Sequence, residues 1–216
     1  MNIALIVFGI IAVVGGVIAI SMHLQKKRTE AMRSVAATMN FTFAEKPDTA
    51  LRERLSHLHL FSQGHSKKIR NVLTGRAGEM DVRVFDYRYT TGGGKNSHTW
   101  RQTVMLCESA KMSLPKFALR PEHFFHKIGQ VFGLQDIDFD SHPDFSKRYL
   151  LKGDDEREVR KLFDTNTLSF YESHSKLSTE AAGHQLIHYH ASKRVPPEKM
   201  SEFIREGVEV LTLLRT

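Results

Sequence analysis

The chain has little of what marks several specialised protein classes. Among its 216 residues there are one cysteine, six prolines and 14 glycines, and no Lys/Arg block is longer than three residues. A single cysteine excludes a disulfide-stapled scaffold, and so few prolines and glycines exclude a collagen-like chain. A hydrophobic fraction of 41% excludes a wholly disordered chain. Because no long basic block is present, we expect no nucleic-acid partner.

Charge is absent from one long stretch near the N-terminus. From Ile3 to Met22 no residue is charged, and only Ser21 is clearly polar. An apolar run of about 20 residues can span a bilayer. The run lacks the basic first segment, the short apolar core and the small-residue cleavage site of a secretory signal peptide. The sequence therefore predicts an uncleaved transmembrane anchor.

Three basic residues follow the anchor and predict its orientation. Lys26, Lys27 and Arg28 form the only strong charge asymmetry around the span, and positively charged flanks stay in the cytoplasm. We therefore expect the N-terminus outside and the rest of the chain in the cytoplasm. These residues and Arg33 are expected to contact anionic lipid headgroups. Residues 1–28 then form the anchor with its basic flank, and residues 29–216 form one cytoplasmic domain.

Small residues recur four positions apart within the anchor. They are Ala12 with Gly16 and Gly15 with Ala19. Such pairs allow two spans to pack closely as a homo-oligomer, and they also occur in helices that face only lipid. Both interpretations stay open.

The helical pattern continues beyond the basic flank. Apolar residues recur at helical spacing from Met32 to Met39, and no proline occurs before Pro47. We therefore expect the anchor helix to run unbroken to about Asn40, which would hold the domain directly against the membrane surface.

The rest of the chain mixes period-two and helical patterns. Alternating segments at residues 72–76, 81–89 and 99–108 predict an antiparallel meander, preceded by a basic loop at residues 61–71. Further strands are expected at residues 41–43, 116–119, 135–140, 146–151, near 177 and at 185–191, and helices at residues 49–57, 121–132, 156–170 and from 196 to the C-terminus. The last helix is amphipathic and is expected to cover the sheet. Since no internal repeats are visible, the predicted fold class is one α+β domain with a mainly antiparallel sheet.

Five short runs resemble those of a family of bacterial single-pass membrane-anchored proteins of unknown function. The runs are Gly75–Gly78, Phe85–Ser97, Leu119–His126, Asp136–Pro143 and Tyr149–Asp155. The resemblance covers about residues 33–213. It implies a protein tethered to the bacterial inner membrane and carries over no catalytic or binding residue.

A glycine-rich segment separates two of the predicted strands. It contains Gly92, Gly93, Gly94 and Lys95. The phosphate-binding Walker pattern requires an earlier glycine, a Ser or Thr after the lysine, and a strand-to-helix context, and this segment has none of them. Either the segment is a plain hairpin turn, or its tip contacts phosphate headgroups or a partner through Lys95.

Three carboxylates alternate along one predicted strand. Asp136, Asp138 and Asp140 would share a strand face, and their mutual repulsion would favour a divalent cation. The calcium-loop pattern is not met, however, because its glycine and its final glutamate are missing. Alternatively, basic residues of a following strand neutralise the row across a hairpin. The candidates for this are Lys147, Arg148 and Lys152.

Histidines gather at two places. They are His184, His188 and His190 on one face of a predicted strand, and His123 and His126 beside Glu122 on a predicted helix. Imidazoles at such spacings can bind zinc, but local spacing fixes no acidic third ligand, so exposed or hydrogen-bonded structural histidines are the favoured interpretation.

None of these patterns forms a complete catalytic motif, so we predict no catalytic residue and no cofactor. Cys107 alternates with apolar residues and is interpreted as a small buried hydrophobe, not as a nucleophile. The sequence favours a membrane-anchored binding or scaffold module for a protein partner or lipid headgroups, with a second headgroup contact from the basic loop that holds Lys67, Lys68 and Arg70. The alternative is a metal-assisted hydrolase that uses the aspartate row and nearby histidines.

Overall fold

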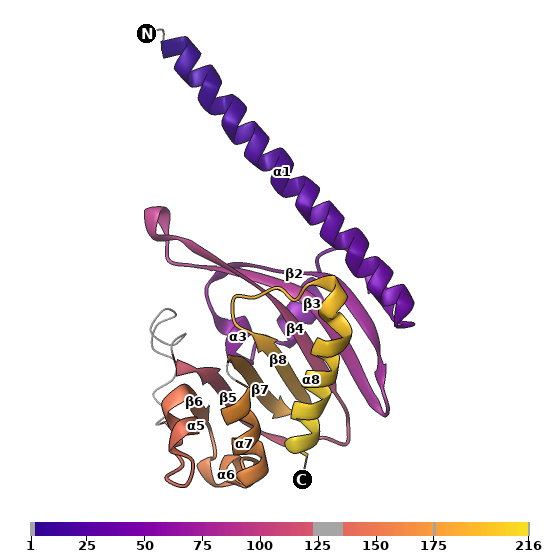
Figure 1. Ribbon diagram of the computed structural model, residues 1–216, viewed down its shortest axis with the longest axis vertical. Helices are drawn as coiled ribbons and strands as arrows, with labels where there is room; N and C mark the ends of the chain where they lie inside the picture. The colour runs from indigo at the N-terminus through magenta and orange to yellow at the C-terminus, as the bar shows by residue number, and fades with distance from the viewer. Residues whose placement is uncertain (1–2, 123–135, 175, 216) are drawn as a thin grey trace.

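A long N-terminal helix, α1 (Ile3–Thr38), rises from a folded domain in the computed structural model, which describes residues 3–122, 136–174 and 176–215 (Figure 1). The apolar side chains from Val7 to Leu24 are exposed, and this helix is long and apolar enough to cross a membrane. The helix ends where Asn40 adopts a left-handed φ of 56°, a common way to terminate a helix. The expectation that the helix continues through the basic flank is confirmed.

The domain is built on one sheet of eight antiparallel strands, in the order β1-β2-β3-β4-β8-β7-β5-β6. The strands are β1 (Thr42–Ala44), β2 (His65–Ala77), β3 (Met80–Thr91), β4 (His98–Glu108), β5 (Leu114–Pro121), β6 (Tyr149–Gly153), β7 (Leu177–Gly183) and β8 (Gln185–His190). Strands β2, β3 and β4 form the predicted meander and are the longest. The predicted α+β class with an antiparallel sheet is confirmed.

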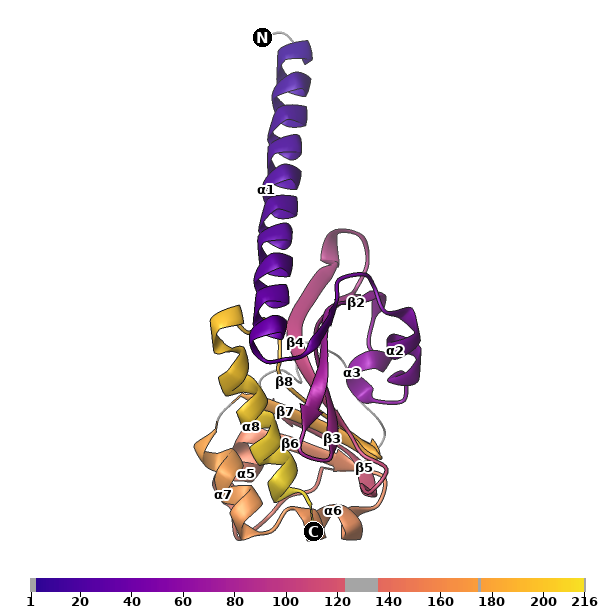
Figure 2. The ribbon, with the colours of Figure 1, turned by 90° about the vertical axis from the view of Figure 1, so that its right-hand side faces the viewer.

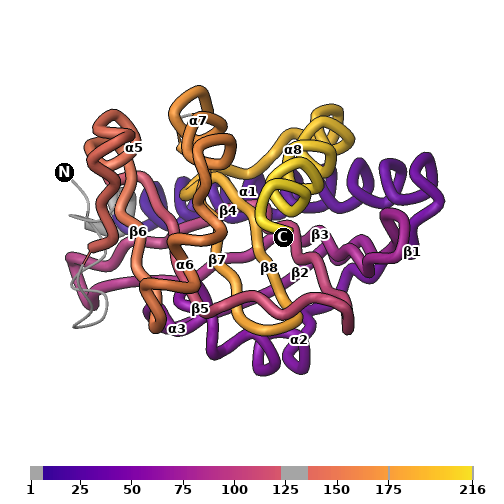
Figure 3. The backbone as a smooth tube through the Cα atoms, turned by 90° about the horizontal axis from the view of Figure 1, so that it is seen from below, coloured from indigo at the N-terminus to yellow at the C-terminus, as the bar shows by residue number. Residues whose placement is uncertain are grey.

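Helices cover both faces of the sheet (Figures 2 and 3). One face carries the end of α1 together with α5 (Pro143–Arg148), α6 (Glu156–Leu162), α7 (Thr165–Ser173) and α8 (Met200–Leu213); the other carries α2 (Thr49–Arg54) and α3 (His59–Ser62). The 3₁₀ turns η1 (Gly94–Asn96) and η2 (Pro197–Lys199) lie in connections. Met32 and Ala36 of α1 are buried in the larger core, so the last turns of the anchor helix belong to the domain.

The C-terminal helix α8 packs on the sheet as the sequence predicts. Phe203, Ile204 and Leu211 are buried on its inner side. Gly207 touches the side chain of Met105 on β4, and a Cβ at this position would collide with the Met105 sulfur. The glycine therefore lets the helix approach the sheet closely.

Three local predictions are wrong. Residues 136–140 form no strand, because the Asp136 carboxylate accepts the Leu151 N–H (2.9 Å) and the Ile137 N–H donates to the Leu151 carbonyl (2.8 Å), which ties this segment to β6 by single bonds. Pro143 then begins helix α5 where a strand is expected. The expected basic loop at residues 61–71 is instead the end of α3 followed by the first half of β2. Most of the helix expected at residues 121–132 lies outside the described residues.

Candidate functional site

The anchor helix is fastened to the sheet by a buried ion pair. The Arg28 guanidinium donates from Nε and Nη2 to the two oxygens of Asp86 on β3, both at 2.7 Å. Its Nη1 donates to the Val195 carbonyl at 3.0 Å. The side chains of Arg28 and Asp86 are only 13% and 10% exposed. A bidentate pair of this kind fixes both position and orientation of the helix end.

The carboxylate of Asp86 is held by further donors. Asn71 on β2 donates its amide to Asp86 at 3.0 Å, and the Thr103 hydroxyl on β4 donates at 3.3 Å. Asn71 sits in a bulge of β2 with a left-handed φ of 53°, and its own oxygen accepts from Thr29 of α1 at 3.0 Å. The bulge therefore helps to bind the helix.

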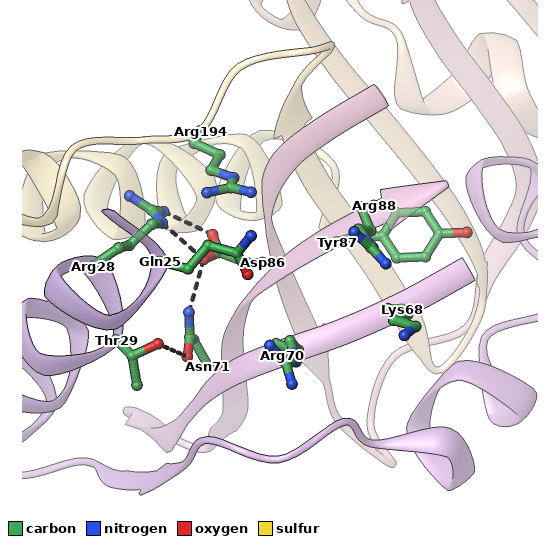
Figure 4. A pocket seen from close by; sticks show the side chains of 10 residues that line it. All are labelled: Gln25, Arg28, Thr29, Lys68, Arg70, Asn71, Asp86, Tyr87, Arg88 and Arg194. Carbon is green, nitrogen blue, oxygen red and sulfur yellow. Dashed lines mark hydrogen bonds and ion pairs between the residues drawn. The ribbon is translucent and has the colours of Figure 1, made fainter. Parts of the chain in front are cut away.

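A pocket of about 130 Å³ opens beside this ion pair, between α1, the β2–β3 pair and the segment after β8 (Figure 4). Its lining residues are Gln25, Arg28, Thr29, Lys68, Arg70, Asn71, Asp86, Tyr87, Arg88 and Arg194. We call it the basic pocket, because five of these side chains are cationic and Asp86 is the one carboxylate.

The basic pocket holds more positive charge than its protein partners neutralise. Asp86 is already paired with Arg28, and Arg70, Arg88 and Arg194 make no side-chain hydrogen bond or ion pair within the part of the chain that the structure describes. Burial lowers the pKa of Arg194, and the charges of Arg28, Arg101 and Arg88 lower it further against the opposing effect of Asp86. A bound anion would relieve this repulsion and accept the free guanidinium donors.

The register of the paired strands explains how the basic side chains of the pocket come together. Lys68 lies opposite Arg88, and Arg70 lies opposite Asp86, so these residues share one face of the β2–β3 pair. Arg88 also lies opposite Arg101 of β4. Sequence reasoning singles out Lys68 and Arg70 as basic but misses Arg88 and Arg194, since only the folded register and the return of the chain after β8 bring them together.

The glycine-rich segment is the tip of the β3–β4 hairpin. The hairpin projects from the domain to the same side as the apolar part of α1 (Figures 1 and 2). Gly92 and Gly94 have left-handed φ angles of 72° and 57°, which a tight turn requires of them. Gly93 and Lys95 are exposed at this tip.

The four residues expected to contact the membrane have different surroundings. Lys26 and Lys27 are exposed on α1. Arg33 is exposed and pairs with Glu45 at 2.9 Å. Arg28 departs from the expectation, because its guanidinium points into the domain toward Asp86 instead of outward from the helix.

The three aspartates do not form a row on one strand face, because residues 136–140 are not a strand. Asp136 accepts the Leu151 N–H, and the backbone carbonyl of Asp138 accepts from Arg160 at 2.8 Å. Asp138 and Asp140 are exposed. Of the candidates for neutralising them, Lys147 and Arg148 belong to helix α5, not to a pairing strand.

Of the three histidines predicted to share a strand face, His188 and His190 lie in β8 and contact an acid from another element. His188 and His190 contact the same Glu206 oxygen of α8 at 3.0 and 2.9 Å, while His184 contacts the Met112 carbonyl elsewhere. Burial alone would raise the pKa of Glu206, but hydrogen bonds from both histidines hold it well below its usual range. His123 and His126 lie outside the described residues.

Cys107 is fully buried in β4. Burial raises the pKa of its thiol to about 12, so the nucleophilic thiolate is scarce at neutral pH. This placement agrees with the interpretation of Cys107 as a core residue.

Comparisons with known proteins add evidence on the fold. No protein-family model and no curated protein matches the sequence. The crystal structure of the mycobacterial trehalose monomycolate transport factor A, TtfA, is similar, with a TM-score of 0.64 and 13% sequence identity over 87% of this chain and 94% of that one. At this identity the likeness shows the fold alone.

Proposed function

We propose that this protein is a membrane-anchored binding module whose basic pocket holds the anionic headgroup of a membrane lipid. The observation that carries this proposal is the set of unpaired arginines, Arg70, Arg88 and Arg194, in a pocket whose wall is the anchor helix itself.

The position of the pocket along α1 favours a lipid ligand. The apolar run ends at Met22, and the lining residues Gln25 and Arg28 follow three and six positions later. At 1.5 Å per residue these positions lie roughly 5 and 9 Å beyond the apolar run, within or at the edge of a headgroup layer of about 5–8 Å. The pocket thus opens at the depth where lipid phosphates lie.

The size of the pocket fits a headgroup and not a whole lipid. Its 130 Å³ is well below the roughly 300 Å³ at which pockets begin to enclose drug-sized ligands. The acyl chains would remain in the bilayer, while Lys95 at the hairpin tip and the exposed Lys26 and Lys27 add nonspecific attraction to the surface. TtfA is named for the transport of trehalose monomycolate, which is consistent with a membrane role for this fold.

The orientation of the module in the membrane and the association of two copies are inferred from sequence patterns. The basic flank that follows the span favours a domain on the cytoplasmic side of a bacterial inner membrane. Two copies can associate through the small residues of the span, where Gly15 and Gly16 have open space around them.

Lipid titration of the detergent-solubilised full chain tests the proposal. Phosphatidylglycerol is expected to bind more tightly than phosphatidylcholine, and to bind less tightly as salt rises, when binding is followed by native mass spectrometry. The double variant Arg70→Gln/Arg88→Gln is expected to lose about 30-fold in affinity, since each basic residue near a membrane surface contributes about 1 kcal/mol.

The matched control is Arg76→Gln/Arg157→Gln, which removes the same charge from exposed positions away from the pocket. Equal losses of lipid affinity in both double variants would show that net charge alone explains the effect, and would contradict a role for the basic pocket. Inorganic phosphate that binds as tightly as the lipid would identify a free anion as the ligand instead.

A further inference from the structure

Two histidines of β8 and one glutamate of α8 direct their ligand atoms to a common point. His188 and His190 lie two residues apart, so both rings leave the same face of the strand. Their Nε2 atoms lie 3.0 and 2.9 Å from the same oxygen of Glu206. All three ligand atoms lie within 4.8 Å of one another.

The cluster is built into the core at one end and open at the other. The His188 side chain is 0% exposed, whereas those of His190 and Glu206 are 20% and 24% exposed. Phe203 of α8 packs against both imidazole rings, at centroid distances of 5.4 and 6.0 Å. The rings are therefore held in place by packing as well as by hydrogen bonds.

The hydrogen-bonded arrangement leaves His188 incompletely satisfied. Its Nδ1 is buried and has no hydrogen-bond partner among the described residues. Two donors also converge on one Glu206 oxygen. The hydrogen bonds of His188 that the structure describes therefore run through Nε2 alone, the atom that faces Glu206.

A large cavity lies on the open side of the cluster. Its volume is about 580 Å³, and both His190 and Glu206 line it together with His174 from the end of α7. A small ligand or water molecule that enters this cavity therefore reaches the two exposed members of the cluster directly.

We infer that His188, His190 and Glu206 form a binding site for a divalent transition-metal ion, with zinc as the best match to two imidazoles and one carboxylate. Three protein ligands and one open position are typical of zinc sites that bind an exogenous ligand, and here the open position faces the cavity. Alkaline-earth ions prefer oxygen ligands and fit the pair of imidazoles poorly.

To accept the ion, the two imidazole nitrogens, which lie within 4.8 Å of each other, would move to tetrahedral spacing, and both would move slightly away from Glu206. Tetrahedral ligands at 2.0–2.1 Å from zinc lie about 3.4 Å from one another. The two measured histidine–glutamate separations, 3.0 and 2.9 Å, would widen by about half an ångström or less. The metal would bind Nε2 of each neutral imidazole, and the single proton of each ring would then be carried on Nδ1 instead of Nε2.

Metal titration of the full chain in detergent tests this site. The protein should carry no polyhistidine tag, which would bind the same ions, and should be freed of metal with a chelator. Zn²⁺ alone is expected to bind with one ion per chain and to raise the thermal unfolding temperature, and Co²⁺ alone is expected to produce a visible absorption band typical of four-coordinate sites.

Variants separate this site from adventitious binding. Glu206→Gln keeps the side-chain shape but removes the anionic ligand, and His190→Gln removes one imidazole without disturbing the fully buried His188. Each is expected to lower zinc affinity by about 100-fold or more, since loss of even a supporting residue costs roughly 10- to 100-fold. His57→Gln, at an exposed position on the other side of the sheet, is expected to change nothing.

Three outcomes would overturn the inference. They are the absence of stoichiometric zinc binding by the folded wild-type chain, unchanged affinity in Glu206→Gln, and an equal loss in His57→Gln. Thermal unfolding of the metal-free variants shows whether each one is folded. The result is independent of lipid binding, because the basic pocket shares no lining residue with the cluster.

Discussion

Asp86 is the residue on which the attachment of the anchor helix depends. It receives Arg28, Asn71 and Thr103 together, from a helix and two strands. Removing one partner of such a buried pair costs more than the pair contributes, because the other charge is left unpaired in a poorly solvated place.

The variant Asp86→Asn is therefore expected to destabilise the protein by about 3 kcal/mol, because Arg28 keeps its charge and loses its carboxylate. For a chain of this size the loss corresponds to a fall of roughly 6–12 °C in the midpoint of thermal unfolding in detergent. Asp81→Asn, at an exposed position of the same strand, serves as the control and should change the midpoint little. Equal midpoints for the two variants would refute the role of Asp86.

A second buried polar network lies on the other face of the sheet. Glu180 on β7 is 1% exposed and accepts from Arg120, from the Tyr189 hydroxyl at 2.9 Å and from the Leu60 N–H at 3.0 Å. His59 lies beside this network, and burial, followed by the charge of Arg120, lowers its pKa to about 4. Its ordinary value is 6.5, so the folded state holds this histidine neutral at pH values where the unfolded chain protonates it.

Stability is accordingly expected to rise between pH 4 and pH 6.5. In this range the unfolded chain binds more protons than the folded one, so the free energy of unfolding increases with pH, by roughly 3 kcal/mol for a shift of this size. His59→Asn should flatten the profile in this window, as measured by unfolding at a series of pH values. His57→Asn, at an exposed neighbouring position, should leave it unchanged; an identical slope in both variants would contradict the assignment to His59.

At the scale of elements, α1 combines an apolar half that is long enough to cross a membrane with a half that belongs to the domain. Its outer half is exposed and apolar, while its last turns supply Arg28 to the ion pair and Met32 and Ala36 to the core. A domain boundary at residue 28 would therefore separate Arg28, which pairs with the sheet, from Met32 and Ala36, which fill the core, although all three belong to one helix.

Truncation within α1 should show this division directly. A fragment that begins at His23 keeps the Arg28–Asp86 pair, the Thr29 hydrogen bond and the buried Met32, and is expected to unfold cooperatively in urea. A fragment that begins at Ser34 loses the Arg28–Asp86 pair and the buried Met32 side chain, which together should cost at least about 4 kcal/mol. Similar urea midpoints for the two fragments would show that the last turns contribute little.

The sequence predicts elements well where one periodicity dominates. The strands of the meander carry period-two segments and the C-terminal helix has one apolar stripe, so both are correctly assigned. Residues 135–140 also alternate, but Asp136 uses its side chain to bind β6, which no local pattern reveals. Similarly, sheet register and a chain reversal bring Gln25 and Arg194 together in the basic pocket. The acid that contacts His188 and His190 comes from a different element. Neither site therefore has a signature in the local sequence.

At the scale of the whole molecule, the anchor and its flank predict which side of the membrane the pocket faces. A C-terminal fusion to an enzyme that is active only after export is expected to be inactive, and a fusion to a cytoplasm-active reporter is expected to be active. Moving the charge, with Lys26→Gln and Lys27→Gln combined with Asn2→Lys, should raise the exported fraction. Strong export of the unaltered chain would refute the orientation.

Helix α1 is unbroken from its apolar half to the core of the domain, so the proposed span and the domain rotate together as one unit. Because each helical residue turns the chain by about 100° and advances it by 1.5 Å, one alanine inserted after Met22 would swing the domain about a quarter of a turn around the membrane normal without altering any of its contacts. Four inserted residues would return the domain to nearly its original orientation around the helix axis and would move the basic pocket about 6 Å further from the apolar run. The number of residues between the bilayer and Arg28 therefore sets both the rotation of the domain around the membrane normal and its distance from the membrane surface.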